Sequence, residues 1–382
     1  MNCRQVFFAA CALAFAAASA PAKDVLVYFG TYTNATSKGI YVSRLDTDTG
    51  KLSAPELAAT TPSPCYLAIS PDEKYLYAAN SVKGFRDYAT ENGGAVSAFA
   101  IERPTGQLAF LNQKCSGGAG PCHVSVDATG RVLFIANYGD GSEKTYRLET
   151  NGAIGDGGDR VARTGHSENT NRQASAHAHF ICADPSNRFA LVCDLGTDEV
   201  ISYPFDTNTA RLGISRFEVG GVPAGAGARH LAFSRDGKSI YVLNEMGCSI
   251  SRFEMDAKGR LYPMETIAAL PADVPVLASY TAAEILVSPD GKFIYATIRG
   301  HDSISVFAVD APSGKLSFVQ NIPCGGKTPR GLGLDPTGRW LIAANQQSGN
   351  AVEFSVDVTT GKISPTGQEL KIGSPVDVKF VR

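Results

Sequence analysis

Two charged residues, Arg229 and Glu245, stand at the two ends of one short stretch that reads as a β-hairpin. Residues 231–234 form an apolar run, Arg235-Asp-Gly237 is a turn sequence, and residues 239–243 alternate apolar and polar. Because a hairpin brings its two ends to the same edge of a sheet, the arginine and the glutamate are expected to lie close together. A carboxylate can move a proton and an arginine can stabilise a developing oxyanion, so this edge is a candidate catalytic site.

Five related hairpins occur elsewhere in the chain, and comparing them shows which residues share the position of each charge. Their turns lie at Pro71-Asp72, Asp127-Ala128, Asp184-Pro185, Pro289-Asp290 and Asp335-Pro336. In chain order, the residues equivalent to Arg229 are Cys65, Cys122, His179, Ala283 and Arg330. Those equivalent to Glu245 are Ser81, Tyr138, Leu195, Arg299 and Gln346. If the hairpins are arranged around one axis, both sets meet at one end of a central channel.

That channel end combines three arginines with one imidazole and one carboxylate: Arg229, Arg299, Arg330, His179 and Glu245. Such a mouth is electropositive and suits a small anionic substrate. The imidazole and the carboxylate are the natural proton carriers, and the arginines can hold a carboxylate or a phosphate. We therefore expect Glu245, His179, Arg229 and Arg299 to be catalytic.

Residues near this ring receive weaker assignments. Arg330, His177 and Tyr138 are expected to bind substrate, although Arg330 could instead brace the loop at 327–329 and His177 could bond the loop edge. One position further along their strands stand His123, His230 and Glu284; the two histidines are expected to point between blades in structural roles. The polar stretch 155–176 reads as a long loop that could cover the channel.

A second element recurs seven times and sets the fold: a short alternating strand followed by a turn similar to Thr-Gly-Lys-Leu. The copies span 39–52, 94–108, 144–154, 199–212, 249–261, 303–316 and 351–363. Combined with the hairpins, each unit of roughly fifty residues contains four short strands, which is typical of a β-propeller. The sequence predicts an all-β, seven-bladed β-propeller; a solenoid is the alternative.

The two ends of the chain each resemble half of the missing seventh hairpin. Residues 25–32 resemble only its second strand, and residues 375–381 resemble only its first. Pairing of these N- and C-terminal strands in one blade would close the ring and remove a free sheet edge. This split blade favours the propeller over a solenoid.

The first twenty residues have the composition of a secretory signal. Arg4 precedes an apolar run from 6 to 18, and Ala18-Ser-Ala20 provides a cleavage site, with a cut after Ala22 as the alternative. A lipoprotein reading at Cys11 fits its surroundings poorly. We therefore expect a signal peptide at 1–20, a single propeller domain at 21–382, and a protein that is exported to the periplasm or secreted.

Seven cysteines lie after the signal, in a compartment that permits disulfides. Cys115 and Cys122 flank a flexible glycine-rich segment and are the best candidate pair; Cys182 and Cys193, across a predicted hairpin, are a weaker one. With no CxxC pair, a zinc cluster is not expected. Oxygen ligands near the channel, such as those of Glu245 and Asp194, could hold a divalent ion, but the arginines disfavour one. We expect no metal or cofactor.

The chain carries a formal net charge of -2 and no basic block, which argues against nucleic acid as a partner. No apolar stretch after the signal is long enough to cross a membrane. We expect a monomer whose partner is a small anionic lactone or sugar acid, for the reason that follows.

Several motifs resemble the seven-bladed β-propeller lactonases, a family that includes bacterial 6-phosphogluconolactonases and fungal carboxymuconate lactonising enzymes. The resemblance spans the mature chain, and the motifs are Phe29-Gly-Thr-Tyr-Thr33, Pro121-Cys-His-Val-Ser-Val-Asp127, Asn137-Tyr-Gly139, His177-Ala-His179, Arg229-His-Leu-Ala232, Leu243-Asn-Glu245, Arg299-Gly-His-Asp302 and Lys327-Thr-Pro-Arg-Gly331. The family's proposed active-site residues are a histidine, two arginines and a glutamate. By motif they fall on His179, Arg229, Arg299 and Glu245.

The resemblance favours hydrolysis of a sugar-acid-type lactone by an exported carboxylic ester hydrolase. An exported enzyme is expected to meet an unphosphorylated aldonolactone or another extracellular lactone. A propeller that binds a glycan or a protein without catalysis is the second hypothesis. A muconate-type lactonising cycloisomerase, with the same glutamate and histidine moving a proton, is the third.

Overall fold

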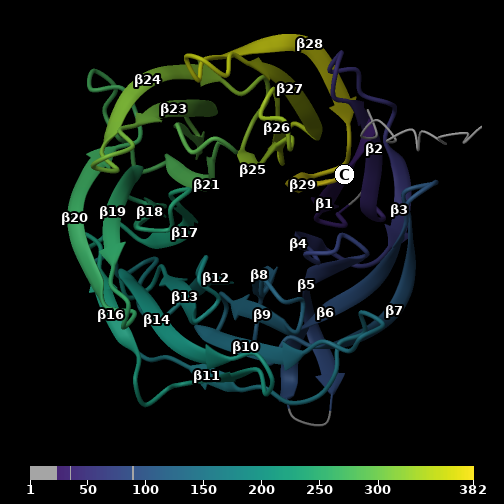
Figure 1. Cartoon of the computed structure of the whole chain (residues 1–382), viewed down its shortest axis with the longest axis vertical. Coiled ribbons are helices and arrows are strands. Elements are labelled where there is room, and N and C mark those ends of the chain that lie inside the picture. The colour runs from purple at the N-terminus through teal and green to yellow at the C-terminus, as the bar shows by residue number, and fades with distance from the viewer. Residues whose placement is uncertain (1–23, 35, 88–89) are drawn as a thin grey trace, which may run out of the picture.

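The structure, a computed structural model, describes residues 24–34, 36–87 and 90–382. These residues form seven antiparallel sheets arranged as blades in a ring around a central axis (Figure 1). The predicted all-β, seven-bladed β-propeller is therefore confirmed, and the solenoid is not. The predicted signal at 1–20 lies outside the described residues. Within the described ranges, no helix is long and apolar enough to cross a membrane.

In each blade the strands lie side by side, in an order that goes from the central axis to the outer rim of the ring. In order outwards the blades are β29 (Pro375–Val381), β1 (Asp24–Thr31), β2 (Gly39–Asp46) and β3 (Glu56–Thr60); β4 (Pro64–Ile69), β5 (Tyr75–Asp87), β6 (Thr90–Glu102) and β7 (Gln107–Cys115); β8 (Pro121–Val126), β9 (Val132–Asn137), β10 (Ser142–Arg147) and β11 (Arg160–Ala162); β12 (Ala178–Ala183), β13 (Phe189–Asp194), β14 (Glu199–Asp206) and β15 (Arg211–Leu212); β17 (Ala228–Phe233), β18 (Ser239–Asn244), β19 (Ser249–Met255) and β20 (Leu261–Ala268); β21 (Thr281–Val287), β22 (Phe293–Arg299), β23 (Ser303–Val309) and β24 (Leu316–Pro323); and β25 (Pro329–Leu334), β26 (Trp340–Asn345), β27 (Asn350–Val356) and β28 (Ile363–Lys371). In the fourth of these blades, β16 (Glu218–Gly221) also pairs with β14.

The inner hairpins form where the sequence predicted them, and local hydrogen bonds explain why the turns are tight. Between β17 and β18, the Asp236 carboxylate accepts the Lys238 amide, and the Ser234 hydroxyl donates to Asp236. Gly237 completes the turn with a φ of 70°, in the left-handed region that glycine adopts without steric cost. The charged residues at the two ends of this hairpin are thereby held at one edge.

The chain closes into a ring because its first and last strands pair in one blade, as predicted. Phe29 of β1 lies opposite Val378 of β29 in an antiparallel ladder. The fully buried Asp377 of β29 then joins this blade to the next. Its carboxylate accepts the Leu67 amide of β4 at 2.7 Å and the Lys379 ammonium at 2.7 Å. Polar contacts therefore reinforce the closure beside the axis.

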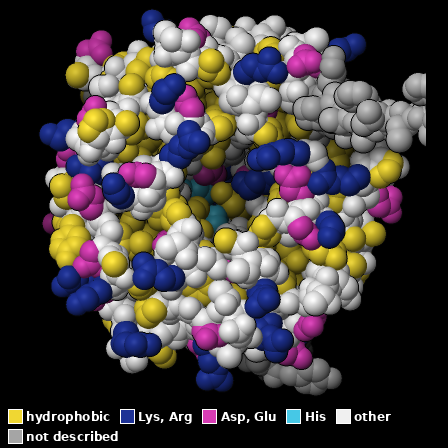
Figure 2. Space-filling model, viewed as in Figure 1, with side chains coloured by type: hydrophobic (Ala, Val, Ile, Leu, Met, Phe, Trp, Pro, Cys, Tyr) yellow, Lys and Arg dark blue, Asp and Glu magenta, His cyan; other side chains and the backbone are white. Residues whose placement is uncertain are grey.

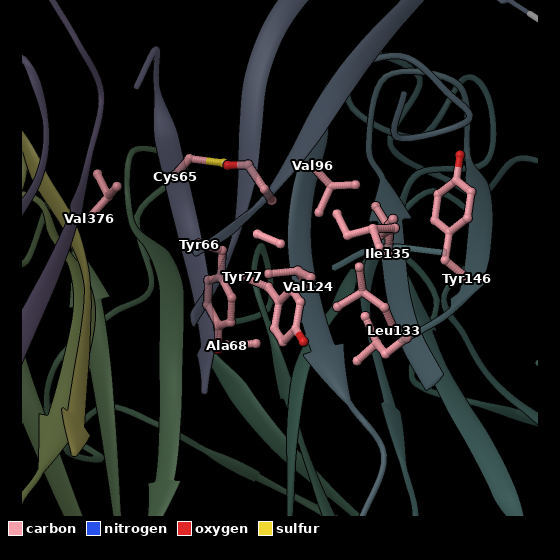
Figure 3. Packing of buried hydrophobic residues seen from close by; sticks show 14 residues of the cluster. Cys65, Tyr66, Ala68, Tyr77, Val96, Val124, Leu133, Ile135, Tyr146 and Val376 are labelled. Atoms are coloured by element: carbon pink, nitrogen blue, oxygen red, sulfur yellow. The ribbon is translucent and has the colours of Figure 1, made fainter. Parts of the chain in front are cut away.

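Apolar side chains fill the space between neighbouring blades. In Figure 3, Val96, Val124, Leu133 and Ile135 pack together where the blade of β4–β7 meets the blade of β8–β11. All six residues of β9 are buried, because both faces of that strand are covered. Burial of each large aliphatic side chain contributes about 1.5–3 kcal/mol, so these layers hold the ring rigid around its axis. The apolar residues of these strands therefore serve to pack neighbouring blades together.

The predicted disulfides are not formed. Among the described residues, no disulfide joins any of the seven cysteines, Cys65, Cys115, Cys122, Cys182, Cys193, Cys248 and Cys324. Cys115 ends β7 at the outer edge of one blade, whereas Cys122 lies on β8, the innermost strand of the next. Cys182 pairs with Leu191 in the ladder, and Cys193 with Phe180, so these two cysteines are not opposite each other. Spacing along the chain could not reveal this separation between strands.

Candidate active site

A β-bulge at the same place in the innermost strands sets the position of the ring residues. In β17, Ala228 pairs with Asn244 and His230 pairs with Leu243, which leaves Arg229 without a partner in the ladder. His179 in β12 and Arg330 in β25 occupy the same unpaired position. A bulge turns a side chain out of the strict alternation of a strand, and bulges occur often beside active sites.

A pocket of about 350 Å³ lies at this end of the channel. Its walls are formed by Tyr32, Ser81, Gly120, Cys122, Tyr138, Gly139, Arg172, His179, Glu245, Thr281, Arg299 and Arg330. Five of the seven predicted site residues, all except Arg229 and His177, therefore line one cavity. Figure 2 shows histidine side chains at the floor of the hollow in the middle of the ring.

Glu245 is the centre of the site, because three arginines bind its carboxylate. Arg229 Nε and Arg299 Nη2 each lie 2.9 Å from Oε2, and Arg172 Nη2 lies 2.6 Å from Oε1. Burial alone would raise the pKa of Glu245, but the guanidinium groups and His179 hold that pKa well below its usual value. These charges therefore favour the carboxylate form of Glu245.

Arg229 lies behind Glu245 rather than in the wall of the pocket. Its side chain is only 2% exposed, and its second hydrogen bond goes to the Ala283 carbonyl of the neighbouring blade. A guanidinium held at both ends in this way fixes the orientation of the carboxylate. The structure therefore gives Arg229 a positioning geometry, whereas Arg299 and Arg330 face the cavity.

His179 offers a neutral imidazole beside the carboxylate. Burial lowers the pKa of His179 well below its usual value, and the positive charge of Arg229 adds to this effect. Its Nδ1 atom is buried and has no hydrogen-bond partner. An uncharged imidazole in a cavity is able to accept a proton, which is the property a general base needs.

Tyr138 and His177 form a supporting pair at the rim. Their rings are stacked, with centroids 4.5 Å apart and planes 12° apart, and His177 Nδ1 lies 2.7 Å from the Tyr138 carbonyl oxygen. Tyr138 faces the pocket, and its hydroxyl lies 3.3 Å from Arg172 Nη2. His177 thus contacts the loop edge, the alternative that the sequence left open, and supports a wall residue.

Arg330 lies in the wall of the pocket, with its guanidinium 5.6 Å from the centre of the Tyr32 ring. A cation over an aromatic face is attracted by the ring, so this contact holds the arginine toward the cavity. The predicted substrate-binding position is consistent with this geometry.

The expectation that His123 and His230 point between blades was wrong. His230 lies 5.6 Å from the ring of Tyr66 and 5.5 Å from that of His123, although these residues belong to blades that are not neighbours in the ring. The bulge explains the error, because it directs consecutive residues of the innermost strand toward the axis. His230 Nδ1 also lies 2.9 Å from Glu284 Oε1, so a buried polar layer forms the floor below the pocket.

Sequence reasoning missed Arg172. It lies in the loop between β11 and β12, where the stretch 155–176 was interpreted only as a possible cover over the channel. Repeat alignment could not identify it, because Arg172 lies outside the aligned hairpins. The signal that could have found it is the presence of arginines in a polar insertion that precedes a ring strand.

The carboxylates considered for a metal have other partners. Asp194 Oδ1 accepts the amides of His177 and Gly196 in the turn after β13. Among the described residues, no group of three or more histidine, cysteine or acidic side chains is arranged to hold a metal ion. Glu245 binds arginines instead.

Comparisons with known proteins agree with this architecture. A family model described as "Lactonase, 7-bladed beta-propeller" matches residues 26–380. A 6-phosphogluconolactonase of Bacillus subtilis is 34% identical, over 93% of this chain and 97% of that protein. The structure of a putative 6-phosphogluconolactonase from Bacteroides fragilis matches with a TM-score of 0.86 and 31% identity, over 94% of this chain and 99% of the other. A periplasmic gluconolactonase of Pseudomonas aeruginosa matches with a TM-score of 0.85 and 30% identity, over 94% and 99%.

Proposed function

The chain belongs to the seven-bladed β-propeller lactonase family and is a lactone-hydrolysing enzyme, and we propose that Glu245 and His179 activate the water that opens a small sugar-acid-type lactone. The observation that carries this proposal is the axial pocket, in which a carboxylate held by three arginines lies beside a neutral imidazole. Hydrolysis of a lactone needs these groups, because a water must lose a proton while the carbonyl oxygen gains charge.

The size and charge of the pocket support a small substrate. A volume of about 350 Å³ lies at the lower end of the range for ligand sites and suits a single sugar ring. Arg172, Arg299 and Arg330 outnumber the one carboxylate among the lining residues. An excess of fixed positive charge favours a substrate or a transition state that is negative.

The proposed reaction proceeds in two steps. The Glu245 carboxylate orients a water molecule, which attacks the lactone carbonyl carbon while His179 accepts its proton. Arg299 and Arg330 stabilise the oxyanion of the tetrahedral intermediate, as preorganised cations do in acyl transfer. The ring C–O bond then breaks, and the protonated His179 returns its proton to the leaving oxygen. The product is an open-chain hydroxy acid, and the enzyme regains its starting state.

Measurement of activity on a panel of lactones tests the function. Purified protein is expected to hydrolyse at least one aldonolactone with a kcat/KM of about 10⁴ M⁻¹s⁻¹ or more, followed by pH-stat with the uncatalysed rate subtracted. Absence of any rate above background would refute hydrolysis. Consumption of a muconate in the same preparation would favour the cycloisomerase, and tight binding of a glycan without turnover would favour the binding propeller.

The pKa of His179 predicts an unusual acid limit. A base works only when it is unprotonated, and burial keeps the imidazole neutral at pH values where an ordinary histidine is charged. As pH falls through 6.5, kcat/KM for a lactone is therefore expected to stay on its plateau and to decline only well below that pH. Initial rates across pH check this, with His166→Gln as a control in an exposed histidine. A decline centred near 6.5 would exclude His179 as the base.

Location remains part of the proposal. The composition of residues 1–20 supports export, and one structural relative is described as a periplasmic gluconolactonase. An exported enzyme of this kind acts on aldonolactones formed outside the cytosol. Recovery from the periplasm of a chain that begins at Pro21 is the matching observation.

A further inference from the structure

Of the three arginines on Glu245, Arg172 is held least firmly. Its side chain is 39% exposed, compared with 2% for Arg229 and 13% for Arg299. It is also the only one of the three that comes from a loop, since the other two lie on β17 and at the end of β22. Arg172 is therefore the partner that Glu245 can lose without disturbing the propeller.

The loop itself is anchored, so only the side chain needs to move. Next to Arg172, Gln173 is fully buried and donates through Nε2 to the Leu195 carbonyl. Asn169 accepts the Arg172 amide, and Ser167 donates to Asp198. The backbone is thus fixed on both sides of Arg172, while its guanidinium extends into the pocket on a flexible aliphatic chain.

The contact with Arg172 occupies one of the two oxygens of the Glu245 carboxylate. Arg229 and Arg299 both bind Oε2, whereas Arg172, whose side chain lines the cavity, binds Oε1. While Arg172 stays there, Oε1 is blocked from orienting a water. An anion that enters the pocket competes with Glu245 for the same guanidinium, because carboxylates and phosphates bind arginine in the same way.

We propose that Arg172 is a specificity-determining residue that recognises a second acid group on the substrate and, by moving to it, frees Glu245 Oε1 to orient the water. The proposal rests on the hydrolysis proposed above and narrows its substrate class. The preferred lactone carries a carboxylate or a phosphate away from the reacting carbonyl. A neutral lactone cannot displace Arg172 and reacts slowly. Tyr138, whose hydroxyl lies 3.3 Å from Arg172 Nη2, offers a second contact for the guanidinium.

Three lactones separate the possibilities: neutral glucono-1,5-lactone, 6-phosphoglucono-1,5-lactone, and glucaro-1,4-lactone with its free carboxylate. Wild-type enzyme is expected to prefer at least one anionic lactone over the neutral one by about tenfold or more in kcat/KM. In Arg172→Gln, kcat/KM for that lactone is expected to fall about 10- to 100-fold, the size of a lost charge-assisted contact. For the neutral lactone it is expected to rise, because Oε1 is no longer covered.

The pH profile provides a readout that a merely structural role would not give. Loss of the Arg172 charge leaves the Glu245 carboxylate less neutralised, and that carboxylate raises the pKa of His179, so the acid limb set by His179 is expected to move to higher pH for the neutral lactone. The variant leaves unchanged every other charged or titratable group that interacts electrostatically with Glu245. These groups are Arg229, Arg299, Arg330, His179, His230 and Cys248. Arg172→Lys, which keeps the charge, is expected to restore part of the preference for the anionic lactone.

Arg160→Gln is the matched control. Arg160 lies on β11, is 40% exposed and binds the Asp140 carboxylate at 3.0 Å, so the substitution removes a similar arginine from the same part of the chain. It is expected to leave all three rates unchanged. Equal loss in Arg172→Gln on all three lactones, or no change on any, would overturn the proposed switch while lactone hydrolysis stands. Absence of activity in the wild type on every lactone would instead refute the hydrolysis itself.

Discussion

Glu245→Gln is expected to lower kcat for lactone hydrolysis by about 10²- to 10⁴-fold, the usual effect of removing a positioned acid–base group. The amide keeps the size of the side chain but is a poor acceptor for a water that must lose its proton. It also removes the negative charge that balances Arg229, Arg299 and Arg172. Steady-state kinetics on the best lactone of the panel measure the loss.

Glu265→Gln provides the control for this substitution. Glu265 lies on β20 of the same blade, and its carboxylate binds Arg252 Nε at 3.0 Å, so an arginine–glutamate contact is removed far from the pocket. Its kcat is expected to match that of the wild type. Retention of full activity in Glu245→Gln would mean that another group activates the water.

Asp377→Ala is expected to lower the free energy of unfolding by about 3–5 kcal/mol, the cost of breaking a buried ion pair by removal of one partner. The substitution leaves the Lys379 ammonium without its carboxylate and the Leu67 amide without its acceptor. Because Asp377 joins the blade that closes the ring to β4, the substitution removes contacts at the place where the two ends of the chain meet. Denaturant-induced unfolding, monitored by fluorescence, measures the change.

Asp357→Ala shows what an exposed aspartate contributes. Asp357 follows β27 and accepts the amides of Thr359 and Thr360 in a solvent-exposed turn. Its removal is expected to cost about 1 kcal/mol or less. If both variants lost the same small amount, the contacts of Asp377 would not be a significant part of ring closure.

The fold and most of the pocket followed from repetition in the sequence. Each hairpin has a recognisable turn sequence. Alignment on these turns therefore placed His179, Glu245, Arg299 and Arg330 at one end of the axis, where they lie in the structure. The position of a residue within a repeat predicts at which edge of the sheet it lies, but it does not predict how deeply its side chain is buried. For that reason Arg229 was expected at the substrate, whereas it lies behind Glu245.

Two kinds of feature could not be predicted from the sequence. A bulge adds one residue to a strand, and the amino-acid pattern does not reveal it. The predicted direction of the His123 and His230 side chains was therefore wrong. Arg172 lies in a loop outside the aligned hairpins, so comparison of the repeats could not select it. Both depend on tertiary contacts around the axis, which a single hairpin does not contain.

The single unpaired residue in most of the innermost strands has a consequence for how such a protein can be redesigned. Because the ladder continues on either side of it, a change of side chain there removes no cross-strand partner. Cys65 and Cys122 hold this position in two neighbouring blades with small, uncharged thiols. New acidic, basic or ligand-binding side chains could be introduced at these two positions one at a time, so the propeller would serve as a rigid scaffold for different reactions at its axis.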